Sequence, residues 1–246
     1  KIVMITGGSG TIGFAIAEAF SKLGAQTILV DKDEIALKES VTKLGVGHKY
    51  FPIDVTHSDA ANQAMLAAIN NFGGLDILIS NAGAAHAGPM LDISNEELRN
   101  AFELNFFSHY SFSTEAAKIM KDQNRGGQIL FNISKQAVNP GKNFGAYGLP
   151  KATTFFLMRQ LALELGPDGI RVNGINADRI RSGLLTDDFI SSRAKSRGVS
   201  ESEYMAGNLL NKEVTAEHVA DAFTALACAE STTGHVMTVD GGNIEA

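Results

Sequence analysis

The chain lacks a cysteine pair, a long apolar run and any block of basic residues, and each absence excludes a class of protein. Its single cysteine, Cys228, has no partner for an internal disulfide, and the alanines beside it indicate a small buried group on a helix. No run of about 18 apolar residues exists, so we expect no membrane-spanning segment. The net charge of −6 argues against nucleic acid or an anionic membrane surface as the main partner.

What the chain does contain is the composition of one globular domain. Apolar residues make up 44% and charged residues 20% of its 246 residues, which allows a large core. We therefore predict a single domain over residues 1–246. The sequence opens on an apolar strand with no signal peptide, which predicts a cytoplasmic protein. It opens on Lys1 rather than Met, as a piece of a longer chain would.

A glycine-rich turn follows the first predicted strand. Gly8, Gly10 and Gly13 stand in the frame G-x-G-x-x-G, between the apolar run 2–5 and a stretch of helical apolar spacing. In a dinucleotide-binding fold, such glycines allow a tight turn, the approach of a pyrophosphate and close packing of helix on strand. The N-terminus of the helix then attracts the phosphates. A strand, turn and helix with purely structural glycines is the alternative.

Strands and helices alternate along the rest of the chain. We expect further strands at 27–30, 48–53, 75–79, 128–133, 171–175 and 236–239, and helices at 33–44, 60–72, 94–121, 147–165 and 215–229. This order predicts an α/β fold: a single doubly wound, Rossmann-like parallel sheet of about seven strands with helices on both faces.

One segment, which begins at Ser182, interrupts this alternation. Ligands of such sheets bind beyond the carboxyl ends of the strands, so we expect residues 182–213 to form a substrate lid. A surface excursion without function is the alternative.

Asp31 follows the second predicted strand, 18 residues after Gly13. A carboxylate at this point accepts hydrogen bonds from the adenosine ribose hydroxyls and repels a ribose phosphate. The spacing therefore favours NAD over NADP, against the alternative of an ordinary solvated aspartate.

Tyr147 and Lys151 are four residues apart, so a helix places both on one face. A neighbouring ammonium favours the phenolate and is expected to lower the pKa of the tyrosine, which makes the pair a plausible acid/base unit. Ser134 ends the fifth strand, where its hydroxyl could hold a substrate oxygen. Asn105 lies awkwardly inside a predicted helix and could bind a buried water. The alternative is a partly exposed helix face, because Y-x-x-x-K is a common pattern.

Other chemistries are poorly supported. The histidines, among them His86, His109 and His218, show no metal-ligand spacing, so we expect no metal site. No histidine partners Ser134 in a hydrolase triad. Arg179 and Arg181 could meet a carboxylate or phosphate near the cofactor, but surface ion pairs are the more common role of such arginines.

Several short motifs together resemble the short-chain dehydrogenase/reductase family over essentially the whole chain. They are Thr6–Gly13, Asp54-Val55, Ser80–Gly83, Asn105, Ser134, Tyr147–Lys151, Arg171–Asn173 and Asp240–Gly242. The resemblance implies catalytic roles for four residues. Tyr147 would be the general acid/base and Ser134 the anchor of the substrate oxygen. Lys151 would give electrostatic support and bind the nicotinamide ribose, and Asn105 would hold a water.

The resemblance also implies NAD as cofactor and a set of residues that binds it. This set is Gly7, Gly8, Ser9, Gly10, Thr11, Ile12, Gly13, Asp31, Asp54, Val55, Asn81, Ala82, Gly83, Tyr147, Lys151, Ala177, Ile180 and Ser182. Three departures from the family pattern stand out. Thr11 takes the place of a glycine, Ala177-Asp178 replaces Pro-Gly, and Pro150 falls inside the Tyr–Lys spacer, where it is acceptable only in a first helical turn.

The segments 147–151, 176–189 and 204–210 resemble more narrowly the dehydrogenase half of bifunctional aldolase/short-chain dehydrogenases of the rhamnose type. That resemblance implies an N-terminal aldolase partner domain, and lactaldehyde or a sugar or polyol as substrate. By analogy with the family we expect a homo-dimer or tetramer. Two alternatives are a catalytically silent nucleotide-binding scaffold and a methyltransferase, the second of which gives no reason for the Tyr147–Lys151 pair.

Overall fold

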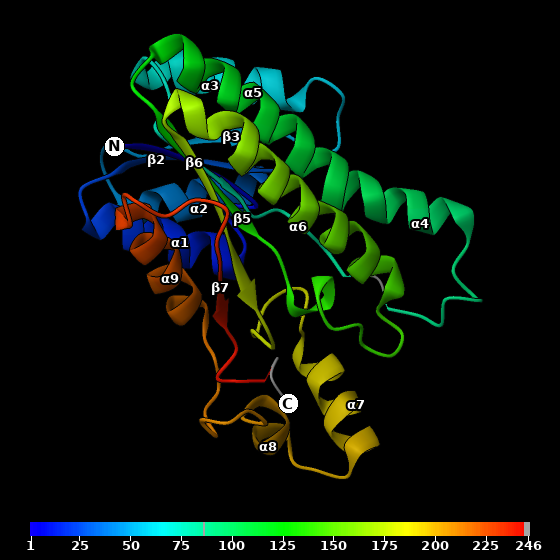
Figure 1. The fold of residues 1–246 in the computed structure, drawn as a ribbon. Helices are drawn as coiled ribbons and strands as arrows, with labels where there is room; N and C mark the ends of the chain where they lie inside the picture. The colour runs from blue at the N-terminus through cyan, green and yellow to red at the C-terminus, as the bar shows by residue number, and fades with distance from the viewer. Residues whose placement is uncertain (86, 244–246) are drawn as a thin grey trace.

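The computed structural model describes residues 1–85 and 87–243, which form a parallel sheet between two helical layers (Figure 1). Every pair of neighbouring strands is parallel, and the order across the sheet is β3-β2-β1-β4-β5-β6-β7. The strands are β1 (Ile2–Thr6), β2 (Gln26–Asp31), β3 (Lys49–Pro52), β4 (Ile77–Ser80), β5 (Gly127–Asn132), β6 (Ile170–Ala177) and β7 (Val236–Val239). The predicted fold class is confirmed, and the strand boundaries lie within two residues of those expected.

The two faces of the sheet are covered by different helices because alternate strand residues point to opposite sides. Val3 and Ile5 of β1 lie in the core against α1 (Thr11–Lys22), α2 (Glu34–Leu44) and α9 (Ala216–Cys228). Met4, between them in sequence, lies in the opposite core. That core includes α3 (Ala60–Phe72), α5 (Ser108–Gln123) and α6 (Gly145–Leu165). Near-continuous apolar strands are what a sheet buried on both faces requires.

The helix expected at 94–121 is three successive pieces rather than one. The helix α4 (Asn95–Phe102) begins at a capping box formed by Ser94 and Glu97, and it is followed by a π-helical turn, η1 (Glu103–Phe107), and then by α5. π-helical turns are rare in proteins, and a large share of them lie at functional sites. Asn105 lies in this turn, and its side chain bonds backbone carbonyls instead of facing solvent.

Two further expectations were wrong. Pro150 does not lie in the first turn of α6, because the helix begins at Gly145 and Pro150 is its sixth residue. The carbonyl of Ala146 therefore lacks the N–H that would normally bond to it. Cys228 is exposed rather than buried, since it is the last residue of α9, where the apolar face of that helix ends.

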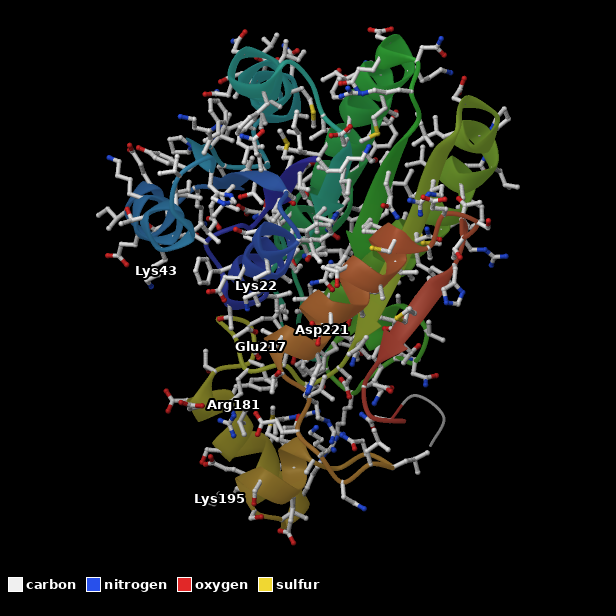
Figure 2. All side chains as sticks on the ribbon, turned by 90° about the vertical axis from the view of Figure 1, so that its left-hand side faces the viewer. Lys22, Lys43, Arg181, Lys195, Glu217 and Asp221 are labelled. Carbon is white, nitrogen blue, oxygen red and sulfur yellow. The ribbon has the colours of Figure 1, made fainter. Side chains whose placement is uncertain are left out.

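The segment after β6 forms two short helices below the sheet, α7 (Asp187–Arg197) and α8 (Glu201–Met205), which Figure 2 shows beneath α9. A small core of their own, made by Leu185, Ile190, Ala194, Tyr204 and Met205, holds them together. No helix among the described residues is long and apolar enough to span a membrane.

Candidate active site

A cleft of about 1240 Å³ opens along the carboxyl ends of β1, β2, β4, β5 and β6. Most of the predicted cofactor and catalytic residues line it, from the glycine turn and Asp31 at one end to Ser134, Tyr147 and Lys151 farther along. Ala177, Ile180 and Ser182 after β6 line it as well. Three predicted residues, Gly8, Ser9 and Asn105, do not line it.

Three glycines, Gly7, Gly8 and Gly13, are required by the local structure, and a Cβ on Gly8 would lie only 2.8 Å from Cβ of Leu29. Gly7 has a φ of +64°, a conformation that side chains rarely adopt. A Cβ on Gly13 would collide with the carbonyl oxygen of Gly7, so α1 approaches the turn as closely as it does only because Gly13 has no side chain. Gly10 has room for a side chain, since the atom nearest to an added Cβ is the carbonyl oxygen of Gly7, 3.5 Å away.

Thr11, the departure from the family pattern, is the first residue of α1 and is exposed to the cleft. No side chain caps this helix, and no acidic residue stands in its first turn. The first N–H groups of α1 are thus free to donate hydrogen bonds to an anion, which the positive end of the helix dipole also attracts. This arrangement fits the pyrophosphate of a dinucleotide.

Asp31, at the end of β2, lies beside the same turn. One carboxylate oxygen accepts from the backbone N–H of Ser9 at 3.3 Å, and the other from that of Lys32 at 2.8 Å. These bonds hold the carboxylate at the rim of the cleft. Asp54 also lines this end, and hydrogen bonds from the backbone and hydroxyl of Thr56 lower the pKa of its carboxyl. Both groups fit the hydroxyl and amino donors of an adenosine.

Asn81 connects the glycine turn to the middle of the cleft. Its side-chain nitrogen donates to the carbonyl oxygen of Thr6 at 3.0 Å, and its side-chain oxygen accepts from Asn132 at 2.9 Å. The carbonyl of Asn132 in turn accepts from Lys151 Nζ at 2.8 Å. A continuous polar chain thus joins the end of β1 to the helix that carries the predicted acid/base pair.

Ser134 and Tyr147 both line the cleft, and the Ser134 hydroxyl lies close enough to the phenol to lower its pKa. Burial raises the pKa of Tyr147 to about 12, and the Ser134 hydroxyl lowers the pKa by less than burial raises it. The expected lowering by Lys151 is absent, because the ammonium faces the Asn132 carbonyl and lies 5.8 Å from the centre of the tyrosine ring. Tyr147 is therefore a phenol at neutral pH, ready to donate a proton.

Lys151 is 2% exposed, and burial lowers its pKa to about 7. Besides the Asn132 carbonyl, its Nζ lies 3.4 Å from Nε2 of His109. His109 is itself buried, and its Nδ1 lies 2.6 Å from the hydroxyl oxygen of Ser80 at the end of β4. Burial and the charge of Lys151 hold the pKa of His109 well below its usual range, so the imidazole is neutral.

The sequence did not indicate a role for His109, which was considered only as a metal ligand and rejected for lack of metal-ligand spacing. One signal for it was present, since His109 follows Asn105 by four residues and so shares a helix face with it. Its position next to Lys151 could not be read from the chain, because 42 residues separate the two.

Asn105 supports the site from behind. Its side chain accepts from the backbone N–H of Ala84 at 3.3 Å and donates to the carbonyl of Ala84 at 2.9 Å. Its own carbonyl accepts from the Thr154 hydroxyl on α6 at 2.8 Å. The residue thereby fastens the loop after β4 and the helix α6 to the π-helical turn, and its role as a holder of water stays a prediction.

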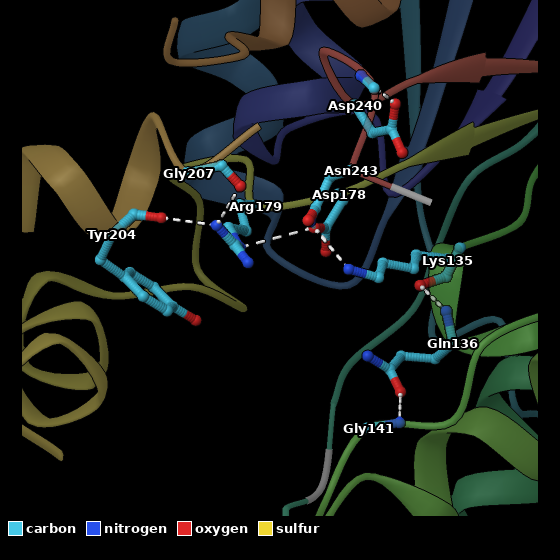
Figure 3. A network of polar contacts seen from close by, with 11 residues as sticks. Lys135, Gln136, Gly141, Asp178, Arg179, Tyr204, Gly207, Asp240 and Asn243 are labelled. Carbon is cyan, nitrogen blue, oxygen red and sulfur yellow. Dashed lines mark hydrogen bonds and ion pairs between the residues drawn. The ribbon is translucent and has the colours of Figure 1, made fainter. Parts of the chain in front are cut away.

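Asp178, which replaces a family glycine, is the centre of a polar network at the end of β6 (Figure 3). Its carboxylate lies 3.4 Å from Lys135 Nζ and 3.5 Å from Arg179 Nε, and it also accepts from Asn243. Arg179, with a φ of +54°, donates to the carbonyls of Tyr204 at 2.7 Å and Gly207 at 3.1 Å. Asp178, through Lys135 and Arg179, thus joins the loop after β5 to the segment that carries α8.

Metal chemistry finds no support in the part of the chain that the structure describes. No group of three or more His, Cys, Asp or Glu side chains that could hold an ion occurs there. His86, one of the histidines considered in the sequence, lies outside the described residues.

Known proteins share both the sequence pattern and this arrangement. A family profile described as enoyl-(acyl carrier protein) reductase matches residues 8–243. Short-chain dehydrogenase reductase 3b of Arabidopsis thaliana is 30% identical over 246 residues, which cover 98% of this chain and 95% of that protein. The chain belongs to the short-chain dehydrogenase/reductase family. Another member, the uncharacterized oxidoreductase YuxG of Bacillus subtilis, is 33% identical over 98% of this chain. The chain spans only 37% of the length of YuxG.

Solved structures of the family agree with the fold and include nicotinamide complexes. A 3-ketoacyl-(acyl-carrier-protein) reductase from Brucella melitensis, complexed with NADH, has a TM-score of 0.91 at 25% identity. The match covers 99% of this chain and 98% of the reductase. An L-sorbose reductase from Gluconobacter frateurii, complexed with NADPH and L-sorbose, has a TM-score of 0.91 at 28% identity. That match covers 100% of this chain and 97% of the sorbose reductase. The chain is thus an oxidoreductase of the short-chain dehydrogenase/reductase family, and these two structural neighbours bind nicotinamide cofactors.

Proposed function

We propose that the protein transfers a hydride between NAD and a small hydroxylated alcohol or aldehyde. The observation that carries the proposal is the pair of Ser134 and Tyr147, which line the same cleft as the glycine turn and Asp31. A catalytically silent scaffold would have no use for this pair. A nicotinamide, when bound, accepts or returns the hydride of the reacting carbon.

The protein's own groups handle the proton and the substrate oxygen. In the direction of reduction, the neutral phenol of Tyr147 donates its proton to the carbonyl oxygen, while the Ser134 hydroxyl donates a hydrogen bond to the same atom. In the direction of oxidation, a Tyr147 phenolate takes the proton of the substrate hydroxyl. The Lys151 side chain, held by the Asn132 carbonyl, binds the ribose of the cofactor.

The preference for NAD over NADP rests on Asp31. Its carboxylate is fixed at the rim of the adenosine end by backbone bonds, so it would repel a ribose phosphate. The same bonds leave lone pairs free to accept from ribose hydroxyls.

The segment 182–213 is proposed to cover the substrate, because Leu185, Phe189, Arg193 and Tyr204 of this segment line the cleft. The narrower resemblance supports a chain that is the dehydrogenase half of a bifunctional aldolase/dehydrogenase, with lactaldehyde or a sugar or polyol as substrate. We further propose that the protein acts in the cytoplasm.

Pairing of the long helices into a homo-dimer or tetramer is supported by large apolar side chains that α6 exposes. Phe156 is 71% and Leu163 is 77% exposed on this helix, and Tyr110 on α5 is 47% exposed. Single apolar side chains are normal at a surface, but several on adjacent helices mark a contact face. Light scattering of the purified protein, compared with a Phe156→Glu variant, measures the oligomeric state directly.

The experiment that tests the function is an absorbance assay of the reduced nicotinamide. The protein is mixed with NAD or NADP and a panel of small aldehydes, polyols and hydroxy acids. We expect turnover of at least one compound, with NAD preferred. Absence of turnover with every compound and both cofactors would contradict the proposal.

A further inference from the structure

Two arginines of α7, Arg193 and Arg197, line the cleft without forming an ion pair among the described residues. They follow Phe189 at intervals of four residues, and all three line the cleft, so one face of α7 is turned toward it. Lys195 lies on the same helix, is exposed and does not line the cleft (Figure 2).

The other arginines of this region are engaged. Arg179 pairs with Asp178, and Arg181 pairs with Asp187 at 2.7 Å and Glu213 at 2.8 Å. Arg181, which Figure 2 shows above Lys195, does not line the cleft. Arg181 thus holds this segment together away from the cleft, and Arg179 lines the cleft but is paired with Asp178, whereas Arg193 and Arg197 line the cleft without an ion pair among the described residues.

Arg193 is partly desolvated by two aromatic rings. Its guanidinium lies 5.6 Å from the centre of the Phe144 ring and 5.9 Å from that of Phe189. Its Nε is buried and has no hydrogen-bond partner. A guanidinium that loses water and gains no carboxylate is left with unused donors, and an oxyanion in the cleft would satisfy those of the terminal Nη atoms rather than the buried Nε.

Arg193 lies at the substrate end of the cleft rather than at the adenosine end. Phe144, which its guanidinium covers, directly precedes α6, and the backbone N–H of Tyr147 donates to the Phe144 carbonyl at 3.1 Å. Asp31, by contrast, lines the far end beside the glycine turn.

The charges around Arg193 are mainly positive. The exposed cations Lys142 and Arg197 line the same cleft. Of the acidic side chains that line it, Asp31 and Asp54 lie at the adenosine end, Asp178 is occupied by Lys135 and Arg179, and Glu103 is exposed on the π-helical turn. The potential at this end therefore favours a negatively charged ligand.

We propose that Arg193 binds an oxyanion of the substrate, a carboxylate or a phosphate on the same small molecule as the reacting hydroxyl or carbonyl. This inference rests on the proposed function and narrows its substrate class to hydroxy acids or phosphorylated alcohols and their carbonyl counterparts. Lactaldehyde, which is neutral, is then a poor substrate. Bidentate pairing is the geometry that an arginine fork offers to such groups.

Calorimetric titration of the protein saturated with NADH tests the inference with three compounds that do not react with the reduced cofactor. Glycerate supplies the carboxylate, glycerol phosphate the phosphate, and glycerol is the neutral reference. We expect at least one anion to bind about 30-fold or more tightly than glycerol, since loss of a hydrogen-bonded charge pair has effects of this order. The anion that binds identifies the source of the charge.

Matched variants assign the effect to Arg193. Arg193→Gln should remove the preference for the anion, Arg193→Lys should keep part of it, and Lys195→Gln on the outer face of α7 should leave it intact. The affinity for NADH, followed by NADH fluorescence, should stay the same in all three. Lack of binding by both anions, equal binding of glycerol, or an unchanged preference in Arg193→Gln would overturn the inference.

Turnover of the same compounds with NAD separates this inference from the proposed function. Turnover of alcohols without preference for an anion would contradict the Arg193 site alone. Selective binding of an anion through Arg193, without turnover of any compound in the wider panel, would contradict the proposed function alone.

Discussion

Lys151 Nζ and His109 Nε2 lie 3.4 Å apart, and both side chains are buried. A neutral imidazole at this distance can accept a hydrogen bond from the ammonium and so helps to keep the lysine in place. We expect His109→Leu to lower kcat by roughly tenfold at neutral pH, the order expected for loss of a hydrogen bond to a charged group.

The pH profile distinguishes this positioning role of His109 from a merely structural one. Without the acceptor, the Lys151 ammonium is less stable, so activity that needs the cation should fail at a lower pH than in the wild type. His109→Gln, which keeps an acceptor, should recover part of kcat. A kcat profile of the same shape in all three proteins would contradict the role.

The buried charge of Lys151 also makes stability depend on pH. Its pKa is about 7 in the folded chain, against the usual value of 10.5. Between these values the unfolded chain binds a proton that the folded chain does not, so the free energy of unfolding rises with pH across this window. Below this pH window, where Lys151 is charged in both the folded and the unfolded chain, its burial destabilises the folded chain to the full extent.

Lys151→Met removes this penalty and should therefore raise Tm, relative to the wild type, more at about pH 6.5 than at about pH 9.5. We expect the two shifts to differ by a few degrees, since about 1 kcal/mol corresponds to roughly 2–4 °C in a chain of this size. Thermal melts followed by circular dichroism measure it. Lys195→Met, at an exposed lysine, is the control, and equal shifts for Lys151→Met at both pH values would argue against a buried ammonium.

Gly13 and Gly10 of the glycine frame should respond differently to alanine. A methyl group on Gly13 meets the Gly7 carbonyl, so Gly13→Ala must move α1 away from the turn and should lower Tm and weaken NADH binding by at least about tenfold. Gly10→Ala has space in the protein and should keep the Tm of the wild type. Melts and NADH fluorescence titrations check both variants, and a stable Gly13→Ala protein with normal NADH affinity would refute the close approach.

Asp31→Ala should relax the choice of cofactor. Removal of the carboxylate ends the repulsion of a ribose phosphate, so kcat/KM with NADP should rise relative to that with NAD by about tenfold or more. Steady-state kinetics with both cofactors measures the ratio. A wild-type protein that already prefers NADP would show that Asp31 does not discriminate.

The sequence carried enough to predict the sheet and the order of its parts. Apolar strands alternate with amphipathic helices, and the carboxyl ends of parallel strands lie at one edge of the sheet, so the sequence predicts one cleft for Asp31, Asn81 and Ser134. The glycine frame was readable for the same reason, although only the structure shows that Gly13 has no room for a side chain and Gly10 does.

What could not be predicted depends on contacts between distant parts of the chain. The π-helical turn at Asn105 arises where the side chain bonds the loop after β4, which no helical periodicity reports. The pKa of Tyr147 rises because the protein buries the ring, whereas spacing alone suggested that Lys151 would lower it. The unpaired state of Arg193 is likewise a property of the folded segment, since the sequence gives four arginines between 179 and 197 and no sign of which are paired.

The most direct test of the proposed function is kcat of Tyr147→Phe together with its affinity for NADH. The variant keeps the ring and removes only the hydroxyl that exchanges a proton with the substrate. We expect kcat to fall by about 100-fold or more while NADH binding stays close to that of the wild type. Retention of wild-type activity by Tyr147→Phe, in a protein that binds NADH normally, would contradict the assignment of Tyr147 as the general acid/base.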